Sequence, residues 1–333
     1  MAAAPVDRDA VLVTGGNSGI GLECARELAR AGRHVLIASR NRDASAEAVR
    51  SIETESGAGA AEALELDLGS LASVRQLAKE LEARDVRLRA LVCNAGLQVS
   101  RGAKTSADGF ELTFAVNHLG HFLLVNLLLA RLAASAPARV VVVASGVHDP
   151  KVRTGMPKAA VADFETLAAT GGPRPGEFSG PLAYVNSKLC NLWFAYELAR
   201  RIEAAGLSSA ARPLTVNAYD PGLVPGSGLA RDYPAPLRLI WDWVLPGVAR
   251  LLSPILPTIN PAPKSGRALA RLVLDPDLER VTGKYFPSHA RWREAASSEA
   301  SYDETRAREL WEASVRMARL APGESPLARV VAS

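Results

Sequence analysis

Residues 10–21 read Ala-Val-Leu-Val-Thr-Gly-Gly-Asn-Ser-Gly-Ile-Gly, and this stretch decides the fold. An apolar run leads into a glycine cluster, and the residues that follow have helical spacing. Glycines let the backbone turn tightly and approach a pyrophosphate, while the following helix offers N–H groups and the positive end of its dipole. A second apolar strand begins about 20 residues further on, as a dinucleotide-binding fold requires. We therefore predict a phosphate-binding turn between a first strand and a first helix.

The alternation of strands and helices continues along the chain. Strands are expected at 10–14, 34–39, 61–66, 88–94, 139–145 and 215–220, with a short last one at 284–286. Helices are expected at 20–31, 43–55, 71–82, 117–134, 182–205 and 303–320. The strands are apolar on both faces, which is typical of buried parallel strands joined by crossover helices. The pattern predicts an α/β fold, a doubly wound parallel sheet (Rossmann fold) forming a single domain over residues 1–333.

Two Pro- and Gly-rich segments interrupt this pattern: an insertion loop at 148–181 and a flap at 222–264. Each follows a strand, and ligands of doubly wound sheets bind beyond the carboxyl ends of the strands. We therefore expect these segments to form the walls of a substrate site.

Composition excludes several classes of partner. The 39 basic and 35 acidic residues give a net charge of +4 without a polybasic run, which suits an anionic cofactor and predicts no nucleic-acid partner. The five histidines have no metal-ligand spacing, so no metal is expected. Residues 1–11 do not resemble a signal peptide, and the three cysteines are odd in number and far apart. Reduced thiols and a cytoplasmic location are the simplest expectation.

The segment 237–259 is strongly apolar, but it also contains Asp242, Arg250 and three prolines. A helix of about 20 residues in lipid would tolerate these poorly, so no transmembrane segment is predicted. A surface flap that touches a membrane peripherally is the preferred interpretation.

The end of the second strand indicates which cofactor binds. A carboxylate there would hold the ribose hydroxyl of NAD, whereas an arginine accommodates the additional phosphate of NADP. The strand ends Ser39-Arg40 without an acid, and both side chains can bind a phosphate. NADP(H) is predicted, with a solvated arginine as the alternative.

Tyr184 and Lys188 are four residues apart, on one face of an expected helix. A tyrosine with its ordinary pKa of about 10 is a poor acid–base catalyst at neutral pH, and a neighbouring ammonium lowers that pKa. Ser145 closes the expected fifth strand, where its hydroxyl could stabilise a substrate oxygen, and Asn117 starts the long fourth helix. A strand-end turn and a helix cap remain the structural alternatives for these two.

Taken in order, these motifs resemble the short-chain dehydrogenase/reductase family over about residues 10–320. The resemblance implies a catalytic tetrad of Asn117, Ser145, Tyr184 and Lys188, in which Asn117 helps to hold a water relay to the lysine. The implied cofactor contacts, besides Tyr184 and Lys188, are Gly15, Asn17, Ser18, Gly19, Ile20, Gly21, Ser39, Arg40, Asp67, Leu68, Asn94, Ala95, Gly96, Pro221, Gly222 and Val224. The family often has a threonine where Gly226 stands, and Ser227 is a candidate substitute. Dimers and tetramers are common in the family, so a homo-oligomer is expected.

The run Asn-His-Leu-Gly-His-Phe at 117–122 resembles a branch that contains retinol dehydrogenase-like enzymes and light-dependent protochlorophyllide reductases. Cys190 and Cys93 match the pigment reductases, whereas Leu97-Gln98 and the pair at 115–116 depart from them. We read Cys190 as core packing or as a proton donor. His148 follows Ser145 and could line the substrate mouth.

The preferred hypothesis is an NADP(H)-dependent oxidoreductase acting on a carbonyl or alcohol of a bulky apolar small molecule, with a Trp- and Leu-rich flap closing over it. One alternative is light-dependent reduction of a carbon–carbon double bond in a tetrapyrrole. The other is a catalytically idle NADP-binding sensor or scaffold.

Overall fold

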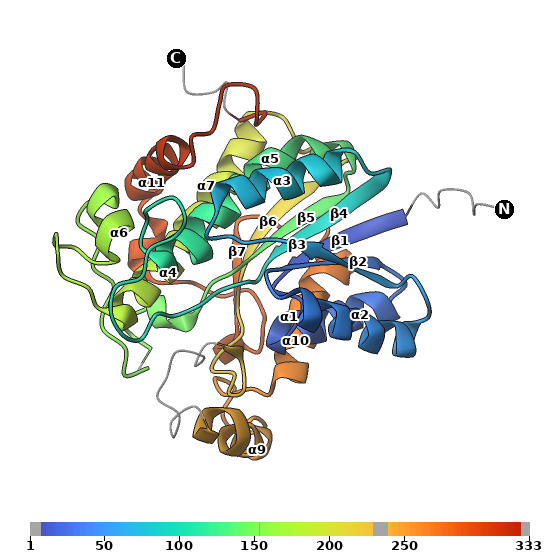
Figure 1. The fold of residues 1–333 in the computed structure, drawn as a ribbon, viewed down its shortest axis with the longest axis horizontal. Coiled ribbons are helices and arrows are strands. Elements are labelled where there is room, and N and C mark those ends of the chain that lie inside the picture. Colours follow the sequence, from blue (N-terminus) through green and yellow to red (C-terminus); the bar gives the residue numbers. More distant parts are fainter. Residues whose placement is uncertain (1–7, 153, 229–238, 328–333) are drawn as a thin grey trace.

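The computed structural model describes residues 8–152, 154–228 and 239–327, arranged as helices on both faces of a parallel sheet (Figure 1). The strands follow the order β3-β2-β1-β4-β5-β6-β7. Their bounds are β1 Arg8–Thr14, β2 His34–Ser39, β3 Ala61–Glu65, β4 Val86–Cys93, β5 Ala138–Val143, β6 Leu214–Asp220 and β7 Lys284–Pro287. The order reverses between β1 and β4, which opens a crevice at their carboxyl ends. The predicted doubly wound sheet is confirmed.

The helices lie on both faces of the sheet (Figure 1), and a hydrophobic cluster on each face holds them to it. One face carries α1 Gly19–Arg30, α2 Arg42–Ser56 and α10 Ala262–Leu274, and its core includes Cys24, Ile52 and Leu269. The other face carries α3 Leu71–Glu82, α5 Gly120–Ala134 and α7 Gly180–Ala204, with α11 Glu304–Met317 packed against α7. Burial of this apolar surface is the main stabilising contribution.

The helix expected at 117–134 begins earlier than the sequence indicated. A short helix, α4 Leu112–Phe114, is capped by the Glu111 carboxylate, which accepts the N–H groups of Thr113 and Phe114 at 2.9 and 2.8 Å. A π-helical turn at Ala115–Leu119 then leads into α5. Asn117 therefore lies inside this turn and does not cap a helix, which corrects the expected start.

This continuous helical run, Leu112–Ala134, is long and apolar enough to cross a membrane by length and composition. In the structure, however, 89% of its most apolar window is buried inside the protein. Its neighbours are α3, α7 and the sheet, as expected of a core helix.

The two inserted segments contain helices that the sequence did not indicate. α6 Phe164–Thr170 lies in the 148–181 insertion, and α10 begins at Ala262, before the expected end of the flap. A proline in the first turn of α10 is tolerated there because that turn needs no N–H donor. The fifth strand is also shorter than expected, because β5 ends at Val143 and Ser145 follows it in a separate loop.

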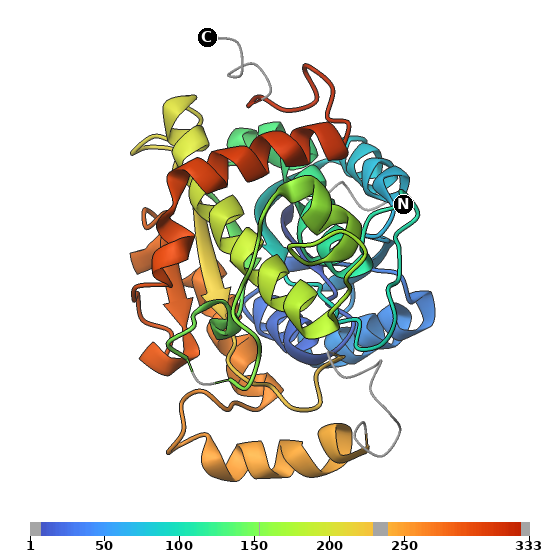
Figure 2. The ribbon, with the colours of Figure 1, turned by 90° about the vertical axis from the view of Figure 1, so that its left-hand side faces the viewer.

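The flap projects from one end of the molecule (Figure 2). Its described part contains a π-helical turn at Ile240–Val244 and α9 Leu245–Leu252, whereas residues 229–238 lie outside the described residues. Several large apolar side chains are exposed here, with Trp243 at 80%, Leu251 at 78% and Ile255 at 77%. The expected membrane contact of 237–259 stays a prediction.

Candidate active site

The glycine turn between β1 and α1 forms one end of a cavity of about 970 Å³. Gly15 and Gly19 have φ angles of +65° and +57°, which glycine adopts without strain. A Cβ on Gly21 would lie 2.4 Å from the Asn94 amide nitrogen and 2.5 Å from the Gly15 carbonyl oxygen, so only glycine fits there. Helix α1 has no acidic residue in its first turn, and that turn lines the cavity. The positive end of the helix dipole therefore faces the space where an anion would lie.

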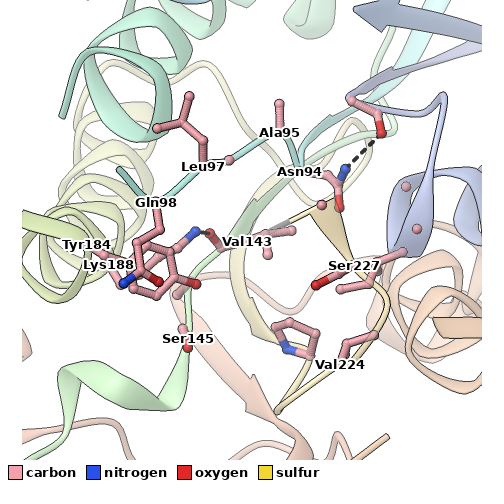
Figure 3. A pocket seen from close by; sticks show the side chains of 18 of the residues that line it. Asn94, Ala95, Leu97, Gln98, Val143, Ser145, Tyr184, Lys188, Val224 and Ser227 are labelled. Atoms are coloured by element: carbon pink, nitrogen blue, oxygen red, sulfur yellow. Dashed lines mark hydrogen bonds between the residues drawn. The ribbon is translucent and has the colours of Figure 1, made fainter. Parts of the chain in front are cut away.

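Thr14 ties this turn to the end of β4. Its hydroxyl oxygen accepts the N–H groups of Asn94 and Ala95 at 2.9 and 3.0 Å. The Asn94 side-chain amide in turn donates to the Thr14 carbonyl at 2.8 Å (Figure 3). These bonds fix the Asn94–Gly96 turn against the glycine motif, on the opposite side of the crevice.

The end of β2 presents a hydroxyl and a cation to the same cavity. Ser39 shares a hydrogen bond of 2.7 Å with Ser45, and the Arg40 guanidinium lies 4.0 Å from the Asp67 carboxylate. The Arg40 side chain is 57% exposed, and both Arg40 and Asp67 line the cavity. Asn41 caps α2 by accepting the Ala44 N–H, so a second helix N-terminus begins beside Arg40.

Tyr184 and Lys188 line the other end of the cavity from helix α7 (Figure 3). The Lys188 ammonium lies 5.5 Å from the centroid of the Tyr184 ring and donates to the Val143 carbonyl at 3.1 Å. Burial lowers the pKa of Lys188 to about 8, and the carboxylate of Asp220 partly opposes this. Lys188 is therefore mostly protonated at neutral pH.

Ser145 also lines the cavity, and its loop is anchored by His148. The His148 ring Nδ1 lies 2.6 Å from the Ser145 carbonyl oxygen, and its Nε2 accepts the Ser298 N–H at 3.1 Å. His148 is buried and is not among the cavity-lining residues. The suggestion that it lines the substrate mouth is therefore wrong, because its ring faces inward and connects two loops.

Asn117 lies directly behind the cavity wall. Its side-chain amide donates to the Leu97 carbonyl and to the Ser187 hydroxyl, both at 3.0 Å, and its oxygen accepts the Leu97 N–H at 2.8 Å. The side chain is fully buried and does not line the cavity. All the other residues predicted for the tetrad and for the cofactor contacts line it, from Gly15 to Val224.

Both inserted segments contribute to the walls of the cavity. Three of the lining residues come from the 148–181 insertion, and others come from the flap. They include Val152, Thr154, Met156, Leu223, Trp241, Thr258 and Ile259. The Trp241 indole donates to the Ser227 carbonyl at 3.0 Å, and a Cβ on Gly19 would lie 3.7 Å from Ser227. The flap thus returns over the glycine turn, and Ser227 lines the cavity there.

The sequence analysis did not predict Asp220 as a site residue, and it left two roles open for Cys190. Asp220 ends β6, is buried, and lines the cavity, where its charge acts on Lys188. An acid directly before the Pro-Gly turn was the available signal for it. Cys190 is fully buried outside the cavity lining, and burial raises the pKa of its thiol, so its surroundings match core packing.

A parallel sheet with a glycine turn, a helix N-terminus and a Tyr–Lys pair around one cavity defines a dinucleotide-binding class of protein. Residues 9–164 match the family model described as short chain dehydrogenase. The chain is 38% identical to the human WW domain-containing oxidoreductase over 308 residues, covering 92% of this chain and 67% of that protein. It is 35% identical to human retinol dehydrogenase 14 over 323 residues, covering 93% and 86%.

A solved structure of an uncharacterised protein from Mycobacterium paratuberculosis aligns with a TM-score of 0.66 and 30% identity, covering 96% of this chain and 98% of that one. This chain belongs to the short-chain dehydrogenase/reductase family of oxidoreductases, with relatives of the retinol dehydrogenase-like branch.

Proposed function

We propose that this protein is an NADP(H)-dependent oxidoreductase that transfers a hydride between the nicotinamide and a carbonyl or alcohol carbon of a bulky apolar substrate. One observation carries the proposal: Tyr184 and Lys188 line the same cavity as the open first turn of α1. A dinucleotide with its pyrophosphate at that turn has room to extend toward the Tyr–Lys pair.

The residues at the cofactor end fit such a ligand. The Gly21 position leaves no room for a side chain, and the backbone of the glycine turn is open to the cavity. Arg40 and Ser39 line the same cavity and would hold the ribose phosphate of NADP(H), because a cation with a planar array of donors binds phosphate well. When bound, the reduced cofactor supplies the hydride.

The chain's own residues then handle the proton. In reduction, the Tyr184 hydroxyl donates a proton to the carbonyl oxygen of the substrate, and in oxidation the phenolate removes one from the alcohol. The protonated Lys188 stabilises the phenolate electrostatically from beside the ring. The Ser145 hydroxyl donates a hydrogen bond to the same substrate oxygen and so stabilises charge that develops on it. Asn117 acts from behind the wall by holding Leu97 and Ser187 in place.

The side chains of the cavity walls support the proposed substrate class. Val152, Met156, Leu223 and Ile259 line the cavity with apolar side chains, and Trp241 adds a large aromatic surface. Such a pocket favours a bulky apolar molecule with a few polar groups. The relative named retinol dehydrogenase 14 agrees with this choice.

Reduction of a tetrapyrrole double bond has less support. The cysteines that resemble the pigment reductases, Cys93 and Cys190, are buried and are not among the cavity-lining residues. A catalytically idle NADP-binding protein is the other alternative. Measurement of turnover distinguishes it from an enzyme.

The test is to incubate the protein with NADPH and a panel of ketones, aldehydes and retinoids, and to follow loss of the reduced-nicotinamide absorbance. We expect turnover that falls at least about a hundredfold in Tyr184→Phe, because a general acid contributes that much or more. Tyr302→Phe, which removes a hydroxyl from an exposed tyrosine outside the cavity lining, is the matched control. Cofactor binding without turnover on any substrate, unchanged by Tyr184→Phe, would support the idle protein instead.

A further inference from the structure

The side chain of Gln98 has an unusual environment for an amide. Gln98 is only 6% exposed and lines the cavity together with Tyr184 and Lys188. Within the described ranges of the chain, no hydrogen bond reaches its side-chain amide. Neither amide atom is among the described side-chain atoms that are both fully buried and unpaired, so both are open to the cavity, where a ligand can bind them.

The backbone on both sides of Gln98 is held firmly. Leu97 uses its N–H and its carbonyl to bind the Asn117 amide, at 2.8 and 3.0 Å. The Val99 carbonyl packs so closely against Gly180 that a Cβ there would lie 1.8 Å from it. Gly180 begins α7, the helix that carries Tyr184. The position of Gln98 is therefore fixed relative to the catalytic tyrosine.

Gln98 also lies near the reacting end of the cavity. A Cβ on Gly96 would lie 3.6 Å from the Lys188 ammonium, and Gln98 is two residues further along this segment. Two extended residues span only about 7 Å. Figure 3 shows the Gln98 side chain extending, in that view, toward the part of the cavity where Tyr184 and Lys188 are drawn.

Among the described residues, the polar groups near Gln98 already have a role or a hydrogen-bond partner, whereas the Gln98 amide does not. Tyr184 and Ser145 serve the oxygen that reacts, and Lys188 already donates to the Val143 carbonyl. An amide can both donate and accept a hydrogen bond, so it can bind a hydroxyl, a carbonyl or an ester oxygen. It cannot bind a hydrocarbon without leaving its own polar atoms unpaired.

We propose that Gln98 determines specificity by binding a second oxygen of the substrate, placed next to the reacting carbonyl. This inference rests on the proposed function and narrows its substrate class. The enzyme prefers bulky apolar α-hydroxy ketones, diketones or keto esters over simple ketones of the same shape.

Benzoin and deoxybenzoin are a suitable pair of probes, because they share a two-phenyl skeleton and differ in the hydroxyl beside the ketone. The measurement is the ratio of their kcat/KM values with NADPH in the wild type, in Gln98→Met and in Gln76→Met. Methionine keeps the length of the side chain without the amide. Gln76, exposed on α3 and not among the cavity-lining residues, is the matched control.

We expect the wild type and Gln76→Met to favour benzoin, and Gln98→Met to lose about tenfold or more of that preference, as removal of one hydrogen bond to a buried group predicts. The intrinsic reactivity of the two ketones cancels in this comparison. NADPH titration of each variant reports on folding. Equal ratios in wild type and Gln98→Met would overturn the role of Gln98 and leave the proposed function standing. No turnover of either ketone, or of any compound in the wider carbonyl panel, would overturn the proposed function itself and the inference with it.

Discussion

The ring Nε2 of His121 lies 2.9 Å from the hydroxyl oxygen of Thr14, and it joins helix α5 to the strand that leads into the glycine turn. The other ring nitrogen, Nδ1, lies 3.2 Å from the Asn117 carbonyl oxygen. A carbonyl oxygen only accepts, so Nδ1 carries the ring proton and Nε2 is an acceptor. The Thr14 oxygen accepts two N–H groups, and its one hydrogen lies within reach of both the Val92 carbonyl at 3.2 Å and the His121 Nε2. The network therefore assigns His121 as a neutral ring that donates to Asn117 and accepts from Thr14. Burial lowers the pKa of His121 to about 4, so this state persists at neutral pH.

Replacing this ring should affect catalysis as well as stability. His121→Phe leaves the Thr14 hydroxyl and the Asn117 carbonyl without this partner, and we expect weaker cofactor binding and a lower kcat. His118→Phe is the matched control, because His118 is also buried, lies one turn away, and bonds Ser314 of α11. Both variants should lose about 1–3 kcal/mol of unfolding free energy. Equal kcat and cofactor affinity in the two would show that His121 has only a packing role.

Arg40 should set the choice of cofactor. Arg40→Ala is expected to weaken NADPH binding by about tenfold to a hundredfold and to leave NADH binding nearly unchanged, because a charge-assisted bond to the phosphate is lost. Isothermal titration with both cofactors measures this. Arg42→Ala, which removes an exposed arginine paired with Glu65, is the control. If Arg40→Ala changed both affinities equally, the NADP preference would come from elsewhere.

A methyl group at position 21 should block the cofactor site. The Cβ of Gly21→Ala would meet Asn94 and the Gly15 carbonyl at 2.4 and 2.5 Å, so the glycine turn must move. We expect cofactor binding to fall more than tenfold. Gly247→Ala, where a Cβ meets nothing within 4 Å, should leave binding unchanged. Wild-type affinity in Gly21→Ala would mean that the turn adjusts freely.

Lys188 should make stability depend on pH. Its pKa in the folded protein is about 8, below its ordinary value of 10.5, so between these pH values the unfolded chain holds a proton that the folded chain has released. Stability from this group therefore rises with pH across that window. Lys188→Met removes the effect, and its unfolding free energy minus that of the wild type should fall by about 3 kcal/mol between pH 7 and pH 10.5.

Urea unfolding at several pH values, with Lys79→Met on α3 as the control for removing a lysine, measures this difference. A difference that stays constant with pH would mean that Lys188 keeps its ordinary pKa.

The exposed apolar side chains of the flap carry the expected membrane contact. Binding to phosphatidylcholine vesicles in a flotation assay should fall several-fold when Trp243 and Leu251 are both changed to serine, because apolar area then stays in water. Tyr302→Ser, at an exposed site on another element, should leave binding unchanged. Absence of vesicle binding in the wild type would contradict the membrane contact. If the molecular mass of the protein in solution then rose with its concentration, the exposed apolar side chains of the flap would instead be assigned to contact with a second copy of the chain.

The sequence predicted regular elements well where one pattern dominated. The strand at 34–39 and the helix at 71–82 match the structure at both ends. An apolar run and an amphipathic helix capped by Ser70 are each compatible with only one type of element at these positions. The start of the helix before Asn117 was missed, since its cap is Glu111 rather than a short polar residue, and a π-helical turn leaves no mark in spacing. α10 was partly read as flap because prolines occupy its beginning.

Site residues were predictable where they lie within or next to sequence motifs. They were not predictable where contacts with residues distant in the sequence determine the position of the side chain. Nineteen of the twenty residues predicted for the tetrad and the cofactor contacts line the crevice, and most of them lie at strand ends, in the turns after strands or in the first turns of helices. The inward orientation of the His148 ring depends on its hydrogen bond with Ser298, which is 150 residues away in the sequence. Gln98 gave only a weak signal, a polar residue after the Asn-Ala-Gly turn. Gln98 is buried because segments distant in the sequence pack around it to form the cavity.

The bond from His148 to Ser298 also has a consequence for how much of the chain a working enzyme needs. The loop that carries Ser145 is tethered to a segment far beyond the residues 9–164 that the family model covers. A shortened chain that kept every catalytic side chain but ended before residue 298 would release that loop. The C-terminal segment thus helps to hold the loop of Ser145 in place, and its removal should loosen that loop although every cavity-lining residue would remain.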